Sequence, residues 1–316
     1  MNDKKDMSIM TTEENKSDIR IFAERLKEKL QSRFVNCLIN VQEVTKNNGV
    51  ILTGITMGEH GCKAAPTIYL ENFFDQYQKG TSWEVIINMI TNQYENMEHH
   101  LQIPDFCDFS KVERRICYKL INAGKNADLL CKVPHRIYHD LAIIYYILVN
   151  KDGNGISSVK VNNELLAIWQ KDENALYDIA SHNTPLLMEN EITTLPGMMS
   201  ELLSQTECID KNLWDLEGAE TEDVLVVSNC YKVEGASTIL YRGVLQKIAR
   251  RLGGDFYLLP SSIHEVICMP CRNCHNEQEL VTMVRQVNAE CVLEEEVLSD
   301  NVYCYDTATD SLRMIQ

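Results

Sequence analysis

The sequence predicts an α+β protein with mixed, largely antiparallel sheets and helices packed on one face. Short β-prone runs recur along the chain, and Asn-Gly or Asp-Gly turn signals separate several of them. Other segments place apolar residues at intervals of three or four, which is typical of amphipathic helices. In the C-terminal third, these segments follow the order β-α-β-β-α-β, with connections that favour an antiparallel sheet.

The N-terminal part predicts a tail, a helix, a hairpin and a second helix. Residues 1–16 are polar and mixed in charge, so we expect a mobile tail. From Ser17 to Phe34, apolar residues at helical spacing predict an amphipathic helix. A β-hairpin is expected next, with strands Cys37–Val41 and Val50–Met57 joined by a turn at Asn47–Gly49. Thr81 and Glu84 then form a capping box that predicts the start of a second helix.

The middle of the chain predicts a central strand. The run from Asp140 to Val149 is continuously apolar and rich in Ile and Tyr, as in strands that are buried on both faces. A turn at Asp152–Gly155 leads to a neighbouring strand, Ile156–Val161. Two short helices are expected next, Glu164–Trp169 and Glu173–Ser181, and Asp172 is the predicted N-cap of the second. Pro185 and Pro196 mark the point where the chain leaves this part of the fold.

An acidic, weakly periodic segment predicts the domain boundary. Residues 204–223 form this linker or excursion, between an N-terminal and middle unit, residues 17–203, and a C-terminal unit, residues 224–316. In the C-terminal unit we expect strands Val224–Ser228, Phe256–Leu259, His264–Met269 and Val302–Tyr305, a helix along Leu240–Leu252 stopped by Gly253-Gly254, and a helix capped by Asn276 with Glu279.

Composition argues against several classes of partner. The chain has 30 Lys and Arg against 46 Asp and Glu, a net charge of -16, without a basic block that could bind nucleic acid or an anionic membrane. The N-terminus lacks the pattern of an export signal, and the apolar run ending at Val149 is less than half of the roughly 20 residues that span a bilayer. The twelve scattered cysteines predict reduced thiols. We therefore expect a cytoplasmic protein whose partner is a protein or small molecule.

Several segments resemble the domain-of-unknown-function family 5688, a bacterial family. They are Pro134-His135, Asp140–Ile143, Asn163–Leu166, Leu176-Tyr177, Asn183–Pro185, Gly235-Ala236, Leu240-Tyr241, Gly243–Leu245, Leu259–Ile267, Val297–Asp300 and Val302-Tyr303. The likeness covers most of the chain from about Ile21 onward. Arg242 departs from it, since a proline is expected there, and so does the cysteine-rich loop Cys268–His275. The resemblance implies no activity, cofactor or catalytic residue.

Cysteine spacing makes that loop a candidate zinc site. Cys268, Cys271 and Cys274 form two C-x-x-C spacings, and His275 follows directly. Because Cys274 and His275 are neighbours and rarely both reach one tetrahedral ion, Cys291 or Cys304 could supply the fourth ligand. The C-x-x-C-H pattern also matches c-type haem attachment, which normally follows export. An iron-sulfur centre lacks a fourth cysteine at the usual spacing. The alternative is a loop of reduced thiols without a cofactor.

A hydrolase-like site is the main catalytic hypothesis. Ser262 and His264 could act as nucleophile and base in a pocket between the middle and C-terminal units, together with Asp140, Asn183 and Asp300. On a strand, however, Ser262 and His264 lie about 6 to 7 Å apart at the backbone. The sequence also lacks a glycine-flanked nucleophile elbow. Their joint position in one concave pocket would favour an enzyme.

The sequence therefore favours a binding or regulatory protein without an assigned activity. Its two rivals are the hydrolase-like enzyme and a zinc-stabilised interaction module centred on Cys268–His275.

Overall fold

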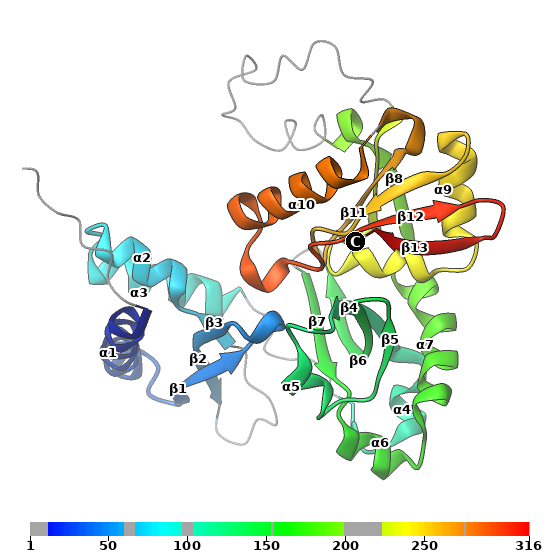
Figure 1. The fold of residues 1–316 in the computed structure, drawn as a ribbon. Helices are drawn as coiled ribbons and strands as arrows, with labels where there is room; N and C mark the ends of the chain where they lie inside the picture. The colour runs from blue at the N-terminus through cyan, green and yellow to red at the C-terminus, as the bar shows by residue number, and fades with distance from the viewer. Residues whose placement is uncertain are drawn as a thin grey trace, which may run out of the picture. The chain divides into compact units, whose positions relative to one another are not determined.

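The computed structural model describes residues 12–59, 67–96, 104–152, 155–198, 223–274 and 276–315. It contains two compact units, Met1–Leu101 and Gln102–Gln316. Both combine helices with antiparallel sheets, which confirms the predicted α+β class (Figure 1). Within the described ranges, every helix is too short or too polar to cross a membrane.

The first unit is a three-stranded antiparallel sheet with three helices. The sheet order is β1-β2-β3, and the predicted hairpin is its first pair. Its turn is a 3-10 segment, Asn47–Gly49, in which Asn48 and Gly49 adopt positive φ. The elements are α1 (Thr12–Arg33), β1 (Cys37–Thr45), β2 (Ile51–Glu59), β3 (Thr67–Tyr69), α2 (Glu71–Gln78) and α3 (Trp83–Glu95).

The core of this unit is formed by the sheet together with α1, α2 and α3. Apolar residues of α1 are buried as the helical spacing predicts, and Phe22 stacks on Trp83 with ring centroids 5.0 Å apart. One detail needs correction, because the N-cap of α3 is Ser82 rather than Thr81. The Ser82 hydroxyl accepts a hydrogen bond from the Val85 amide. Along this helix, Ile86 and Ile90 are buried, whereas Val85 and Met89 are exposed on its outer side.

The second unit contains a four-stranded sheet around a central strand. β6 pairs with β4 along one edge and with β5 and β7 along the other, which confirms the predicted central position. The bounds are α4 (Phe109–Val112), β4 (Ile116–Asn122), α5 (Ala127–Leu130), β5 (His135–Tyr138), β6 (Leu141–Asp152), β7 (Gly155–Lys160), α6 (Asn163–Trp169) and α7 (Glu173–Leu187).

Helix α7 packs against β4 and begins where the sequence predicts. The Asp172 carboxylate accepts a hydrogen bond of 2.8 Å from the Ala175 amide. The helix ends later than predicted, since it continues through Pro185 to Leu187. A proline in the last turn removes only one helical hydrogen bond. At the end of the helix, the hydrogen bond from the Met188 amide to the Thr184 carbonyl is kept at 2.8 Å.

A six-stranded antiparallel sheet forms the rest of the second unit. Its order is β13-β12-β10-β11-β9-β8. Its strands are β8 (Asn190–Thr194), β9 (Leu225–Asn229), β10 (Phe256–Leu259), β11 (Val266–Pro270), β12 (Val302–Asp306) and β13 (Ser311–Ile315). Because β8 pairs with β9, the sheet unites segments from both sides of the predicted linker. Of that linker, only Asp223 lies within the described residues.

Helices α9 (Val244–Leu252) and α10 (Glu277–Cys291) cover opposite faces of this sheet (Figure 1). Leu258 of β10 packs in the cluster that contains α9, whereas its neighbours Tyr257 and Leu259 pack in the cluster that contains α10. The expectation of helices on one face is therefore corrected for this sheet. Its physical reason is visible in β10 and β12, which are continuously apolar and buried on both faces.

One apolar core joins the two sheets of the second unit. It contains buried residues of β4 and β6 together with residues of β9 to β12, α7 and α9. A 3-10 segment, Gly235–Leu240, leads from β9 toward α9 and is buried within this core. The sheets are consequently fixed to each other, and polar residues at their junction lie in defined positions.

Gly235 is a position where we expect substitution by alanine to be costly. A Cβ atom there would lie 2.6 Å from both the Asn229 amide nitrogen and the His264 carbonyl oxygen. Backbone atoms must move to accept it, so Gly235→Ala should destabilise the protein by about 1–3 kcal/mol. Urea unfolding measures this. Gly124→Ala is the matched control, because its Cβ would meet only the Asn122 side chain at 3.6 Å. Equal stability of the two variants would contradict the prediction.

Candidate functional site

Two loop segments lie side by side where the sheets of the second unit meet. We call them the paired loops, Pro260–His264 and Glu296–Asn301. The Leu298 amide donates to the Ser261 carbonyl and the Ser299 amide to the Pro260 carbonyl, each at 2.9 Å. The paired loops carry three of the predicted catalytic candidates, Ser262, His264 and Asp300.

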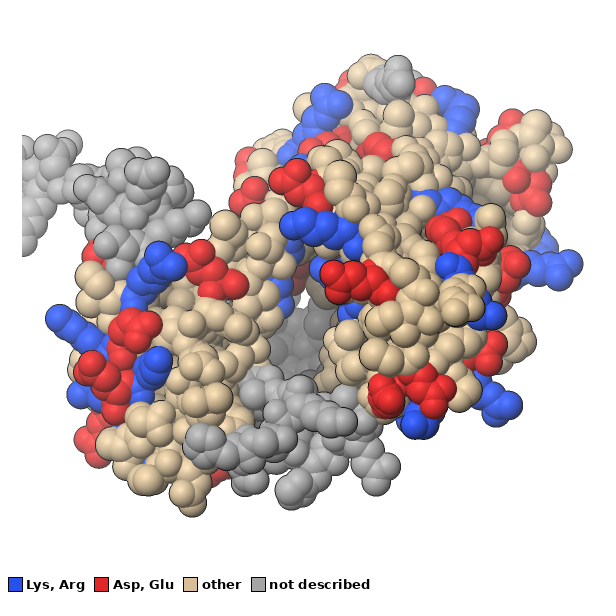
Figure 2. All heavy atoms as spheres, turned by 90° about the horizontal axis from the view of Figure 1, so that it is seen from below, with Lys and Arg blue, Asp and Glu red and all other residues tan. Residues whose placement is uncertain are grey.

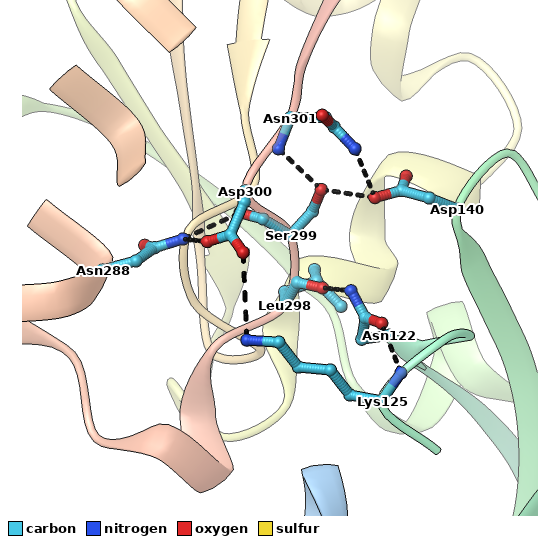
Figure 3. Close-up of polar contacts among 8 residues, drawn as sticks. All are labelled: Asn122, Lys125, Asp140, Asn288, Leu298, Ser299, Asp300 and Asn301. Atoms are coloured by element: carbon cyan, nitrogen blue, oxygen red, sulfur yellow. Dashed lines mark hydrogen bonds and ion pairs between the residues drawn. The ribbon is translucent and has the colours of Figure 1, made fainter. Parts of the chain in front are cut away.

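Asp140 binds the paired loops from the four-stranded sheet (Figure 3). It precedes β6, and its carboxylate accepts hydrogen bonds from Ser299 Oγ at 2.6 Å, from Asn301 Nδ2 at 2.9 Å and from the Tyr303 hydroxyl. Burial raises the pKa of Tyr303, and the hydrogen bond to Asp140 raises it further, so the phenol remains a donor. Ser299 is completely buried. Asp140 therefore acts as a structural tie, and both of its carboxylate oxygens accept hydrogen bonds.

Asp300 turns away from Asp140 (Figure 3). Its carboxylate accepts a hydrogen bond of 2.8 Å from Asn288 of α10 and lies 3.9 Å from the ammonium group of Lys125. Beside it, Asn122 at the end of β4 donates to the Leu298 carbonyl at 3.0 Å. Because each carboxylate has its own donors, Asp140 and Asp300 do not form a paired acid-base site.

His264 is oriented by the backbone and not by Ser262. Its Nδ1 accepts a hydrogen bond of 3.2 Å from the Glu234 amide, which leaves the hydrogen of the neutral ring on Nε2. Nε2 lies 3.4 Å from the Glu296 carboxylate. The Ser262 hydroxyl accepts from the His264 backbone amide at 3.0 Å. The ring is thus not placed to deprotonate Ser262.

Asn183 lies at the other end of β4. Its side-chain amide donates to the carbonyls of Glu113 and Ile116, at 2.8 and 3.1 Å, and so ties α7 to the start of that strand. Asp140 instead lies near Asn122, where β4 ends. The structure brings four of the five predicted catalytic residues to the paired loops, and leaves Asn183 apart from them.

A charged cluster beside His264 was missed by sequence reasoning. Lys119 of β4 forms an ion pair with Glu234, and both side chains are mostly buried. Burial raises the pKa of Glu265, and the Glu296 carboxylate also raises it, whereas His264 and Ser262 lower it. Because Lys119 and Glu234 are separated by 115 positions, no local pattern could have predicted their contact.

The predicted zinc ligands are not gathered at one point. Cys268 is fully buried in the core on the α9 side, while Cys271 and Cys274 pack against the cluster on the α10 side. Only Cys268 lies on β11, whereas Cys271 and Cys274 belong to the 3-10 turn that follows the end of the strand at Pro270. His275 lies outside the described residues. Among the described residues, no group of three or more His, Cys, Asp or Glu side chains is arranged to hold a metal ion. Cys271 instead meets Cys304, with 3.7 Å between their Sγ atoms.

A groove runs along the C-terminal half of α7. Its volume is about 660 Å³. Leu186 on its surface is 65% exposed. The lining residues combine apolar, acidic and basic side chains: Glu113, Arg114, Asp178, Ile179, His182, Asn183, Leu186 and Leu187. The groove therefore offers both apolar contact and charged partners.

These features define an α+β protein whose junction residues are ordered by internal hydrogen bonds and which carries an open amphipathic groove at the other end of β4. The chain belongs to DUF5688, a family of unknown function, whose model matches residues 19–307. This membership confirms the resemblance found in the sequence. No curated protein and no solved structure matches the chain.

We expect Asp140→Ala to destabilise the second unit. The substitution leaves the buried Ser299 and Tyr303 hydroxyls without their common acceptor. Unsatisfied buried donors cost about 1–3 kcal/mol each, so the loss from these two donors should be about 2–6 kcal/mol. Chemical denaturation checks this against Asp128→Ala, which removes an exposed carboxylate. An Asp140→Ala protein as stable as that control would show that the tie contributes little.

Glu265→Gln should stabilise the protein at neutral pH. Since the folded-state pKa of Glu265 is raised, its ionised form is disfavoured on folding. The penalty is complete above the folded pKa and absent below the unfolded value of about 4.3. The stability difference between Glu265→Gln and the parent should therefore shrink on acidification. Thermal unfolding as a function of pH measures it, with exposed Glu290→Gln as control. A difference that grows in acid would reverse the assignment.

Proposed function

We propose that the chain is a binding or regulatory module that acts in the cytoplasm, and that the groove along α7 receives its ligand. One contrast carries the proposal. The residues with catalytic potential are engaged in internal hydrogen bonds, whereas the groove presents an exposed leucine and charges of both signs. A concave surface with an apolar part and a few polar groups is the usual form of a ligand site.

The groove has a rigid base. Thr184 of α7 accepts a hydrogen bond of 3.1 Å from the Tyr118 amide of β4, and Asn183 binds the backbone just before and at the start of the same strand. Helix and sheet are thus held together beneath the exposed face of α7. A preformed surface of this kind loses little conformational entropy when a ligand binds.

The lining residues indicate an amphipathic ligand. Leu186 and Ile179 can contact an apolar group, while Arg114 and His182 can bind a carboxylate and Asp178 a cation. A short peptide or a small molecule with both kinds of group fits this set. The protein's net charge of -16, and the interspersed acidic and basic side chains in Figure 2, favour such a partner over nucleic acid or a membrane surface.

The cysteines support the proposed location. The ten cysteines among the described residues are free thiols. Cys268 and Cys117 are buried among apolar side chains, where a cysteine serves as a small hydrophobic residue. This usage is typical of proteins in a reducing compartment.

A library of amphipathic peptides and small molecules, screened by amide NMR on the full chain, tests the proposal. We expect ligands to shift the amide signals of Ile179, His182 and Leu187. Leu186→Glu should weaken their binding by about tenfold or more, because it removes about 2 kcal/mol of apolar contact. Met283→Glu is the matched control, an exposed apolar residue on α10, and should leave binding unchanged.

The enzyme hypothesis predicts a different outcome from the binding proposal. Turnover of a simple ester by the parent protein, lost in His264→Ala and kept in Leu186→Glu, would overturn the binding proposal and place the activity at the paired loops. Ligands that bind both glutamate variants as tightly as the parent would also contradict the groove assignment.

A further inference from the structure

The loop Cys230–Glu234, which follows β9, has an unusual backbone conformation. Lys232 and Glu234 both adopt positive φ, 54° and 52°, which is uncommon for residues other than glycine. Their conformation therefore depends on contacts that hold the loop in place. The Asn229 side chain supports the first part of the loop, since its oxygen accepts a hydrogen bond of 3.0 Å from the Tyr231 amide.

Two contacts of Glu234 tie the end of this loop to the surrounding structure. Its carboxylate forms an ion pair with Lys119 of β4. Its backbone amide donates a hydrogen bond of 3.2 Å to Nδ1 of His264, which can accept it only while that nitrogen carries no proton. The backbone of the loop is therefore linked directly to the protonation state of one imidazole ring.

The carboxylates around this ring favour its protonated form. Glu296 of the other paired loop lies 3.4 Å from Nε2, the ring nitrogen that does not face the Glu234 amide. Glu265 is the next residue in the chain and interacts electrostatically with the ring. Lys119 opposes protonation, but its charge is paired with the Glu234 carboxylate. A proton can thus be added at Nδ1 while Glu296 binds the resulting imidazolium at Nε2.

We propose that His264 is a pH-sensitive switch, which releases the end of the loop Cys230–Glu234 when its ring is protonated. A protonated Nδ1 places its hydrogen against the hydrogen of the Glu234 amide, so the bond between them is lost. Turning the ring over presents a C–H group instead, which is not an acceptor either. The Glu234 amide then turns toward water, while Asn229 keeps the first part of the loop in place. This switch does not depend on the groove along α7.

Amide hydrogen exchange of the full chain, measured by NMR across the titration of His264, tests the switch. The carbon-bound ring protons of His264 report its protonation. The protection factor of the Glu234 amide corrects for the intrinsic effect of pH on exchange. As the ring is protonated, it should fall by about tenfold, the effect of losing one hydrogen bond. The Tyr231 amide is an internal control and should stay protected, because its acceptor, the Asn229 side-chain amide, does not titrate.

Variants separate the switch from a general loss of stability in acid. His264→Asn places an amide oxygen near the position of Nδ1, where it can accept from the Glu234 amide at every pH, so we expect constant protection. Glu296→Gln removes the carboxylate beside Nε2 and should shift the loss of protection to lower pH, because the imidazolium is less favoured. His139→Asn is the matched control at an exposed turn position with positive φ, and it should behave as the parent does.

Two outcomes would overturn the proposal. One is Glu234 protection that stays constant while the His264 ring of the parent protein titrates, a result that needs no variant. The other is an equal loss of protection in His264→Asn or at the Tyr231 amide, since acid would then act elsewhere in the protein. If His264→Asn does not fold, the parent titration and the direction of the shift in Glu296→Gln decide.

Discussion

The second unit depends on one apolar core shared by its two sheets. Side chains of β4 and β6 pack directly with those of β9 to β12, and α7 and α9 belong to the same cluster. Once this core forms, polar groups in the paired loops and next to them are withdrawn from water and need hydrogen-bond partners. Asp140, Asn122 and His264 supply them. The polar cluster at the junction is thus a consequence of apolar packing.

Local sequence signals predicted the helices and caps that form through interactions between residues close together in the chain. The stripe of α1, the Asp172 cap and the Asn276–Glu279 pair act within a few residues, and all are present. Strands β4, β8 and β13 were not predicted. β4 has Lys119 in an otherwise apolar run, and that lysine is accommodated by Glu234 from a distant loop. β8 is polar and becomes a strand by pairing with β9. Such pairings depend on tertiary contacts that periodicity does not contain.

Prediction of the candidate site from the sequence meets the same limit. Ser262 and His264 suggested chemistry because a hydrolase can use a serine nucleophile and a histidine base. The residue types alone, however, do not determine how their side-chain atoms are oriented toward each other. In the structure, Ser262 and His264 contact backbone amides. Segments that carry the family resemblance, including Asp140–Ile143, Leu259–Ile267 and Val297–Asp300, hold the sheets together. In this chain these segments therefore have an architectural role, and the groove along α7 could be recognised only from the folded surface.

The two faces of the six-stranded sheet pack in apolar clusters of different size. The face under α9 is part of the large core, whereas the face under α10 closes a smaller cluster formed with β10, β12 and β13. Elements that bury less apolar surface open at lower free energy than the rest of a protein. We therefore expect α10 to open at a lower free energy than the main core, so that its amides exchange with solvent through a local opening.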